Sequence, residues 1–320
     1  LGASDFLWED FIRNQYESII PILEGDSTDV SSTPEQLRAR IESVIAKATN
    51  TTDKVKALNE FKDTETFLID LDHIMNPDRD FFFLSSRLAD LAEVVVDHAA
   101  RIAWDEAVAR YGVPRTVAGM QAPYAVFGLG KLGGRALGYA SDIELLYVYG
   151  DSGETDGREV IRNEEFFERF AVQAAANIES KREGIFQVDL RLRPHGSAGP
   201  HAVSLESFNR YYGREGDAHS YEKLALTRLR FVAGDLALGE RVERIRDDLI
   251  YDADSIDLGE LRTLRERQLA EKATGGRLNA KFSPGGLVDL EYGLQILLVQ
   301  HGRTDPSMRT PSLHAALAAF

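Results

Sequence analysis

The sequence has 320 residues, of which 43% are hydrophobic and 28% charged, and it contains no cysteine. The lack of cysteine excludes disulfides, thiol nucleophiles and thiolate metal sites. No apolar run approaches the roughly 20 residues of a membrane span, and no signal peptide is visible, so we expect a cytoplasmic chain without membrane contact. Acidic residues outnumber basic ones by 52 to 37, which disfavours nucleic acid as a partner, because backbone binding needs a basic surface.

Residues 1–115 are expected to be helical, because their apolar residues recur with a period near 3.6. Thr33, followed by Pro34, is a typical N-cap. The pattern predicts four helices. The first begins near Ser4 or Asp5 and the second begins at Thr33. The third spans 54–74, and the fourth runs from Leu84 to the break at 111–114.

The pattern then changes to that of an α/β centre. Short apolar or alternating runs predict strands at 124–128, 145–149 and 185–193, with a helix over 163–182. From Leu205 the chain is expected to be helical to Phe320, with a break at 275–286. The predicted fold class is α+β: mostly helical, with a small central mixed β-sheet. The expected domains are 1–115, 116–235 and 236–320, the last continuing beyond this chain.

A dinucleotide-binding turn is one interpretation of the glycine-rich segment. Gly128, Gly130 and Gly133 match the G-x-G-x-x-G spacing directly after a strand, and Asp151 follows the next strand. The interval before that next strand is too short for the usual helix, and no series of βα units follows. We therefore disfavour this interpretation.

Three carboxylates predict a metal site. Asp142 and Glu144 are two residues apart at the start of a strand, so both side chains leave the same face. Asp189 lies within a later strand, between apolar neighbours. If the two strands are adjacent, the three carboxylates converge, which is costly unless cations lie between them. Two Mg²⁺ ions, or Mn²⁺, suit such oxygen ligands. In the plain alternative, Asp142 caps a turn and the other two are solvated.

The glycine-rich turn predicts an anion site beside these carboxylates. Gly130, Gly133 and Gly134 allow backbone N–H groups to approach phosphate closely. Lys131 supplies positive charge, as do arginines that strand alternation places on the face of Asp189, namely Arg191 and Arg193. The alternative is a plain tight turn next to an exposed strand face.

Four segments in order resemble the glutamine synthetase adenylyltransferase family, within the DNA polymerase β-like nucleotidyltransferase superfamily. The segments are 127–147 (FGLGKLGGRALGYASDIELLY), 188–200 (VDLRLRPHGSAGP), 221–230 (YEKLALTRLR) with Gly234 and Asp235, and 279–292 (NAKFSPGGLVDLEY). The helical residues before them, including 61–67, fit the family more loosely.

The resemblance implies a nucleotidyltransferase core in which Asp142 and Glu144 form the metal-binding pair and Asp189 supplies the third acid. This sequence departs from the family in Glu144, where Asp is usual, and in Tyr221, where Trp is usual. ATP or ADP is the implied nucleotide. Its expected contacts are Gly130, Lys131, Gly133, Gly134, Ser141, Arg191, Arg193 and Glu222, the last also read as a solvated helical residue.

The family attaches AMP to a tyrosine of glutamine synthetase or removes it by phosphorolysis, which regulates nitrogen assimilation. The resemblance therefore implies glutamine synthetase as the protein substrate and raises the PII signalling protein as a further partner. The segment 302–311 leans toward the removing unit, but the direction stays open. Two other functions stay open as well: a catalytically silent nucleotide-sensing module and an RNA-directed transferase, the latter disfavoured by the net charge of −15.

Overall fold

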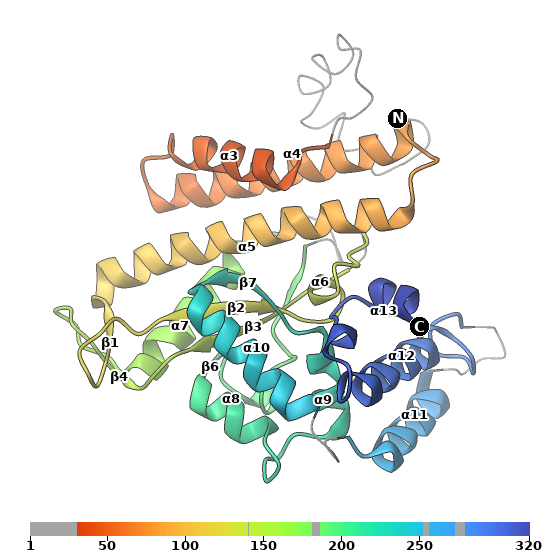
Figure 1. Ribbon diagram of the computed structural model, residues 1–320. Helices are drawn as coiled ribbons and strands as arrows, with labels where there is room; N and C mark the ends of the chain where they lie inside the picture. Colours follow the sequence, from red (N-terminus) through yellow and green to blue (C-terminus); the bar gives the residue numbers. More distant parts are fainter. Residues whose placement is uncertain (1–30, 140, 181–185, 252–255, 273–278) are drawn as a thin grey trace.

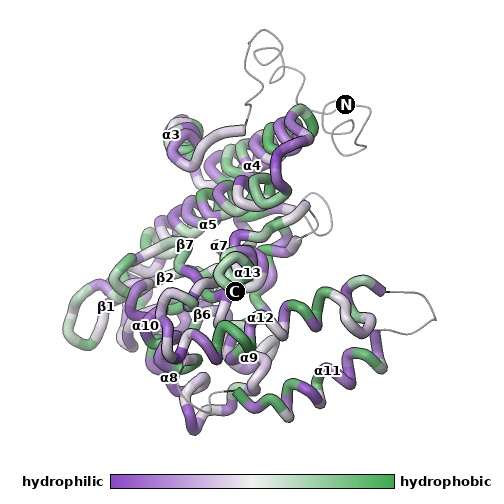
Figure 2. The backbone as a smooth tube through the Cα atoms, turned by 45° about the vertical axis from the view of Figure 1, so that its right-hand side comes forward, coloured by the Kyte–Doolittle hydropathy of each residue, from purple (hydrophilic) through white to green (hydrophobic). Residues whose placement is uncertain are grey.

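The computed structural model describes residues 31–139, 141–180, 186–251, 256–272 and 279–320 (Figure 1). The helix expected near Ser4 lies outside these residues. The described chain is α+β, as predicted, and its helices lie on both sides of a small mixed sheet. Figure 2 shows α3 and α4 outermost, α5 beneath them, and then the sheet.

Three helices form the N-terminal layer, as the sequence predicts. They are α3 (Pro34–Ile45), α4 (Thr51–Met75) and α5 (Phe81–Tyr111). The side chain of Thr33 accepts a hydrogen bond from the N–H of Gln36, and Gln36 bonds back to Thr33, which completes a capping box. Gly112 follows α5 with φ of 82°, a conformation that favours glycine and ends the helix.

Glu65 on α4 gives the N-terminal layer a pH-dependent stability. Its side chain is completely buried, and Arg40 of α3 approaches it to 2.6 Å. Burial raises the pKa of Glu65, although the charge of Arg40 opposes this. The folded chain thus binds a proton here at a higher pH than the unfolded chain. This group therefore favours folding increasingly as the pH falls through the raised pKa toward the unfolded value of about 4.3.

We expect Glu65→Gln to remove this contribution. The stability of the wild type relative to the variant should rise as the pH is lowered from neutrality toward the unfolded pKa of about 4.3, measured by urea unfolding at each pH. Glu60→Gln, at an exposed position of the same helix, is the control. A stability difference between wild type and E65Q that does not change with pH would contradict this assignment.

The central sheet has five strands. The strand order is β5-β3-β2-β7, and β6 also pairs with β3. β2 runs antiparallel to β3 and β7, whereas β5 and β6 are parallel to β3. The strands are β2 (Tyr124–Gly128), β3 (Ile143–Tyr149), β5 (Val188–Asp189), β6 (Ala202–Ser204) and β7 (Arg230–Gly234). A separate two-stranded sheet pairs β1 (Pro114–Thr116) with β4 (Gly153–Thr155).

Both faces of the sheet are buried. Successive side chains of β3 point to opposite faces, and the side chains on each face join a different hydrophobic core. Tyr147 and Tyr149 join a core with α5 and with the phenylalanines of α7 (Asn163–Ala176). Leu146 and Val148 join a second core with α8 (Leu205–Tyr212) and the helices that follow. The central strands are therefore held rigidly between two helical layers.

Several predicted elements differ from those in the structure. The strand expected at 185–193 is reduced to Val188–Asp189 among the described residues, because Asp189 accepts the N–H of Arg191 and turns the chain. The helix expected over 163–182 ends at Ala176, where the amide side chain of Asn59 binds the backbone of Asn177 and Glu179. The helical prediction from Leu205 onward fails at 230–234, which pairs with β2 as β7.

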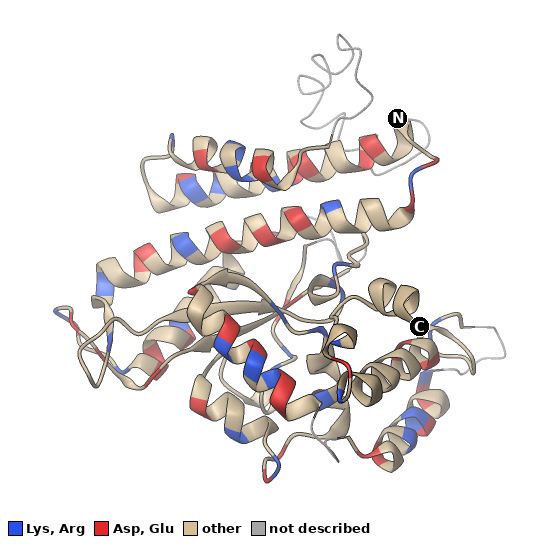
Figure 3. Ribbon diagram, in the orientation of Figure 1, with Lys and Arg blue, Asp and Glu red and all other residues tan. Residues whose placement is uncertain are grey.

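Further helices follow on the other side of the sheet and at the C-terminal end. They are α9 (Ser220–Ala225), α10 (Leu236–Ile250), α11 (Leu258–Lys272), α12 (Leu287–Gly302) and α13 (Leu313–Ala319). The 279–286 segment is not helical, as expected, but residues 303–312 also interrupt the helical pattern with a 3₁₀ turn at Pro306–Met308. Acidic and basic residues are interspersed along the outer helices (Figure 3). Within the described ranges, no helix has the length and apolar character needed to cross a bilayer.

Candidate active site

The glycine-rich turn follows β2 and forms the single helical turn α6 (Gly130–Gly133). Gly130 has φ of 49°, and a Cβ atom there would lie 1.6 Å from Oε2 of Glu144. A Cβ at Gly133 would lie 1.8 Å from the backbone oxygen of Arg228. Both glycines are therefore required for close packing of the turn, one against a predicted metal ligand and the other against the chain preceding β7.

Lys131 ties this turn to the start of β3. Its backbone N–H donates to Oε2 of Glu144 at 3.2 Å, and its ammonium group donates to the hydroxyl of Ser141 at 3.2 Å. The turn, Ser141 and Glu144 thus form one hydrogen-bonded unit, although 13 residues separate Lys131 from Glu144 in the chain.

The acidic residues lie on adjacent strands. β3 and β5 pair in parallel, with Glu144 directly opposite Asp189, and Asp142 immediately precedes β3. Burial raises the pKa of Glu144. The N–H of Lys131 lowers it, and the charges of Asp189 and Asp142 raise it further. The charges of Asp189 and Asp142 therefore both act on Glu144, and β3 and β5 are adjacent, the condition on which the predicted convergence of the three carboxylates depends.

Asp189 is engaged by Arg191. The guanidinium group contacts both carboxylate oxygens, with Nε at 3.0 Å from each and Nη2 at 2.6 Å from Oδ2. Although burial acts in the opposite direction, these bonds hold the pKa of Asp189 below its usual value. In the part of the chain that the structure describes, no three acidic or histidine side chains gather closely enough to ligate one ion.

Arg193 does not share a strand face with Asp189 and Arg191, contrary to the alternation expected for a longer strand. Its side chain is buried, with 6% exposure, and it donates to the carbonyl oxygens of Leu190, Ser197 and Gly199. Arg193 therefore holds the loop after β5 together.

Glu222, a predicted nucleotide contact, has partners within its own part of the chain. Its carboxylate accepts hydrogen bonds from the hydroxyl of Tyr211 and the N–H of His219, both at 2.9 Å. Glu222 thus caps the start of α9, while its neighbour Tyr221 faces the cavity described next.

A cavity of about 440 Å³ collects five of the predicted residues. They are Gly130, Lys131, Ser141, Asp142 and Glu144. Other predicted residues are absent from its lining: Gly133, Gly134, Asp189, Arg191, Arg193 and Glu222. A larger cavity, of about 800 Å³, lies between α4 and α7, away from the carboxylates.

The opposite wall of the smaller cavity comes from residues that the sequence analysis did not predict to be nucleotide or metal contacts. They include Leu192, Tyr221, Leu224, Arg228, Lys281, Val288, Glu291, Tyr292 and Gln295. Arg228 is 8% exposed, pairs with Glu291 at 3.5 Å, and its charge lowers the pKa of Glu144. The 221–230 and 279–292 segments carry part of the family resemblance, but only the packing of α9 and α12 brings both to the cavity of Asp142 and Glu144.

A small mixed sheet that carries paired acids beside a glycine-rich turn is the arrangement implied above for a nucleotidyltransferase core. The model of the glutamate-ammonia ligase adenylyltransferase family matches residues 1–245. The chain therefore belongs to this family.

Relatives described as bifunctional glutamine synthetase adenylyltransferase/adenylyl-removing enzymes match most of the chain. The relative from Methylococcus capsulatus is 32% identical over 292 residues, which are 89% of this chain and 30% of that protein. The relative from Mannheimia succiniciproducens is 31% identical over 286 residues, 86% of this chain and 29% of that protein. The relative from Ralstonia nicotianae is 31% identical over 304 residues, 91% of this chain and 30% of that protein. The chain thus spans less than a third of the length of these relatives.

Proposed function

We propose that this chain is a magnesium-dependent nucleotidyltransferase unit that transfers AMP to a tyrosine of glutamine synthetase or removes it by phosphorolysis. The observation that carries the proposal is the pairing of Glu144 with Asp189 on adjacent strands, with Asp142 and Glu144 lining the same cavity as Lys131. Family membership and the activities by which the relatives are named support the choice of substrate.

The donor set fits Mg²⁺ or Mn²⁺ in kind, because all three side chains offer hard carboxylate oxygens. The charges of Asp142 and Asp189 raise the pKa of Glu144, and a cation among the three relieves this repulsion. Asp142, Glu144 and Asp189 would hold the metal once Arg191 leaves Asp189. When bound, the metal supplies charge stabilisation for a transferring phosphoryl group.

The residues of the chain would do the remaining work by binding and orientation. Lys131 lies at the cavity wall and offers its ammonium group to phosphate oxygens, while Arg228 adds positive charge from the opposite wall. The apolar and aromatic surface formed by Tyr221, Leu224 and Tyr292 excludes water from the base end of a nucleotide. Fixed charges of this kind supply most of the rate in phosphoryl-group transfer.

The two directions differ in the attacking oxygen. In the forward direction the tyrosine oxygen attacks the α-phosphorus of ATP, the tyrosine loses its proton, and pyrophosphate leaves. In the reverse direction inorganic phosphate attacks the adenylyl-tyrosine, and ADP and free tyrosine leave.

Arg191 is the main competitor for a cation at Asp189. We expect Arg191→Gln to tighten Mn²⁺ binding to the nucleotide-free chain by about 3- to 10-fold, because it removes a bidentate guanidinium from a metal ligand. Isothermal titration calorimetry measures this, with Arg210→Gln, an exposed arginine of α8, as the control. Equal Mn²⁺ affinity in wild type and R191Q would show that Asp189 takes no part in cation binding.

A catalytically silent nucleotide-sensing module is the second candidate function. The pairing of Asp189 with Arg191 favours it, since that pair keeps one carboxylate from a metal. Mg²⁺-dependent ATP binding without AMP transfer in either direction would support this module over the enzyme.

The decisive test incubates the chain with labelled ATP, Mg²⁺ and glutamine synthetase, in parallel with pre-adenylylated glutamine synthetase and phosphate. Label transfer to glutamine synthetase indicates the forward activity, and release of ADP indicates the reverse. The proposed activity is wrong if neither occurs while the chain is folded and binds Mg·ATP.

A further inference from the structure

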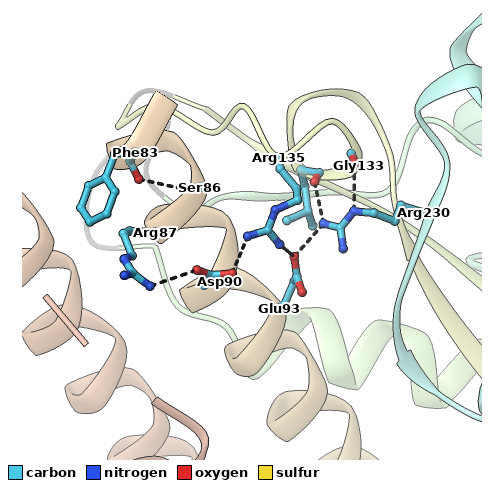
Figure 4. A network of polar contacts seen from close by, with 9 residues as sticks. Phe83, Ser86, Arg87, Asp90, Glu93, Gly133, Arg135 and Arg230 are labelled. Atoms are coloured by element: carbon cyan, nitrogen blue, oxygen red, sulfur yellow. Dashed lines mark hydrogen bonds and ion pairs between the residues drawn. The ribbon is translucent and has the colours of Figure 1, made fainter. Parts of the chain in front are cut away.

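A network of charged side chains joins α5 to the glycine-rich turn (Figure 4). Arg230 of β7 donates from Nε to the carbonyl oxygen of Gly133 and from Nη2 to that of Leu132, both at 3.0 Å. The same Nη2 donates to Oε1 of Glu93 at 2.7 Å. Arg230 thus binds the last two carbonyl groups of α6, and Glu93 accepts a hydrogen bond from the same guanidinium group.

Arg135 makes the second attachment. It follows the turn with φ of 54° and donates to Oε1 of Glu93 at 2.7 Å and to Oδ1 of Asp90 at 2.5 Å. Asp90 also pairs with Arg87 at 3.6 Å. Oε1 of Glu93 therefore accepts from two guanidinium groups that arrive from the two sides of the turn, one after α6 and one from β7.

The network is partly shielded from water. The side chains of Asp90, Glu93 and Arg230 are 8%, 17% and 20% exposed. Charge-assisted hydrogen bonds are stronger in such surroundings than at the open surface. Loss of Glu93 would leave two arginines without this shared acceptor, so the carbonyl groups of α6 would lose a fixed partner.

The glycine-rich turn that this network holds also lines the cavity of about 440 Å³. Gly130 and Lys131 line it, and the N–H of Lys131 donates to Glu144. Because α6 is a single turn, a shift at its C-terminal carbonyls also moves the N–H of Lys131 and the space that Gly130 leaves for Glu144.

We propose that Glu93 and Arg230 are positioning residues that fix the glycine-rich turn for nucleotide binding and thereby couple the N-terminal helical layer to the active site. The inference rests on the proposed function for its ligand, but the contacts of Glu93 and Arg230 with the turn belong to the chain alone. Neither residue lines the cavity, so each acts through the turn.

The test compares Glu93→Gln, Arg230→Gln and Arg230→Lys with wild type in the full chain. Asp97→Asn is the matched control: it removes a carboxylate of α5 that pairs only along the helix with Arg101 among the ion pairs described. Amide hydrogen exchange of residues 129–135 reports the order of the turn, and calorimetry reports Mg·ATP affinity. Arg230→Lys keeps the charge but loses the fork that reaches two carbonyl groups.

We expect E93Q and R230Q to exchange these amides about 10-fold faster and to bind Mg·ATP about 10-fold more weakly, with R230K close to R230Q and D97N equal to wild type. Unchanged exchange in the turn, or faster exchange with unchanged Mg·ATP affinity, would overturn the proposal. So would faster exchange throughout α5 and the sheet, because that marks a general structural role. If the wild type itself binds no Mg·ATP, the proposed function fails. Amide exchange alone then shows whether Glu93 and Arg230 fix the turn.

Discussion

Asp142→Asn is expected to lower AMP transfer, in whichever direction the wild type works, by at least about 1,000-fold, with little change in unfolding temperature. Asp142 immediately precedes β3, lines the cavity and is only partly buried. Asparagine keeps its shape but removes a negative oxygen ligand, and the loss of a charged group that acts in phosphoryl transfer lowers turnover by such factors. Initial rates measured with labelled nucleotide test this expectation.

Asp151→Asn is the matched control for this variant. Asp151 lies just beyond the other end of β3 and its side chain is exposed. The same chemical change there should leave the rate within about twofold of wild type, as surface substitutions usually do. Activity of D142N equal to that of D151N would remove Asp142 from the catalytic site.

Gly130→Ala is expected to lower activity by at least about 100-fold while costing only about 1 kcal/mol of stability. The left-handed backbone accounts for the stability cost. The new Cβ would lie 1.6 Å from Oε2 of Glu144, so the carboxylate must move away. Because a carboxylate ends a flexible side chain, this movement is cheap for folding, but it displaces a proposed metal ligand from its place opposite Asp189.

Gly119→Ala separates the two effects. Gly119 has φ of 80°, and among the described residues no atom lies within 4 Å of the point where a Cβ would be attached. This control should lose a similar amount of stability in urea unfolding and keep its activity, because it carries the backbone strain without the contact to Glu144. If G130A and G119A lose activity equally, the closeness of Gly130 to Glu144 is not what the site requires.

Local patterns in the sequence were enough to predict much of the fold. The Thr33 cap, the apolar stripe of α5 and the short strands at 124–128 and 145–149 depend on neighbours in the chain, and the structure confirms them. The same reasoning failed at Arg193. Strand alternation predicts a common face only while the strand lasts, and β5 ends at Asp189.

The sequence by itself determined the class of fold, the glycine-rich turn and the acid pair Asp142 and Glu144, because periodicity, turn chemistry and two-residue spacing are local properties. The tertiary structure alone decided that Asp189 lies opposite Glu144, that Arg191 engages it, and that Arg230 and Glu93 hold the turn. The contacts of Asp189 with Glu144 and of Arg230 with Glu93 join residues 45 and 137 positions apart. The contact of Arg191 with Asp189 depends on where β5 ends. Strand pairing and the packing of α5 set them, and no short window of sequence contains that information.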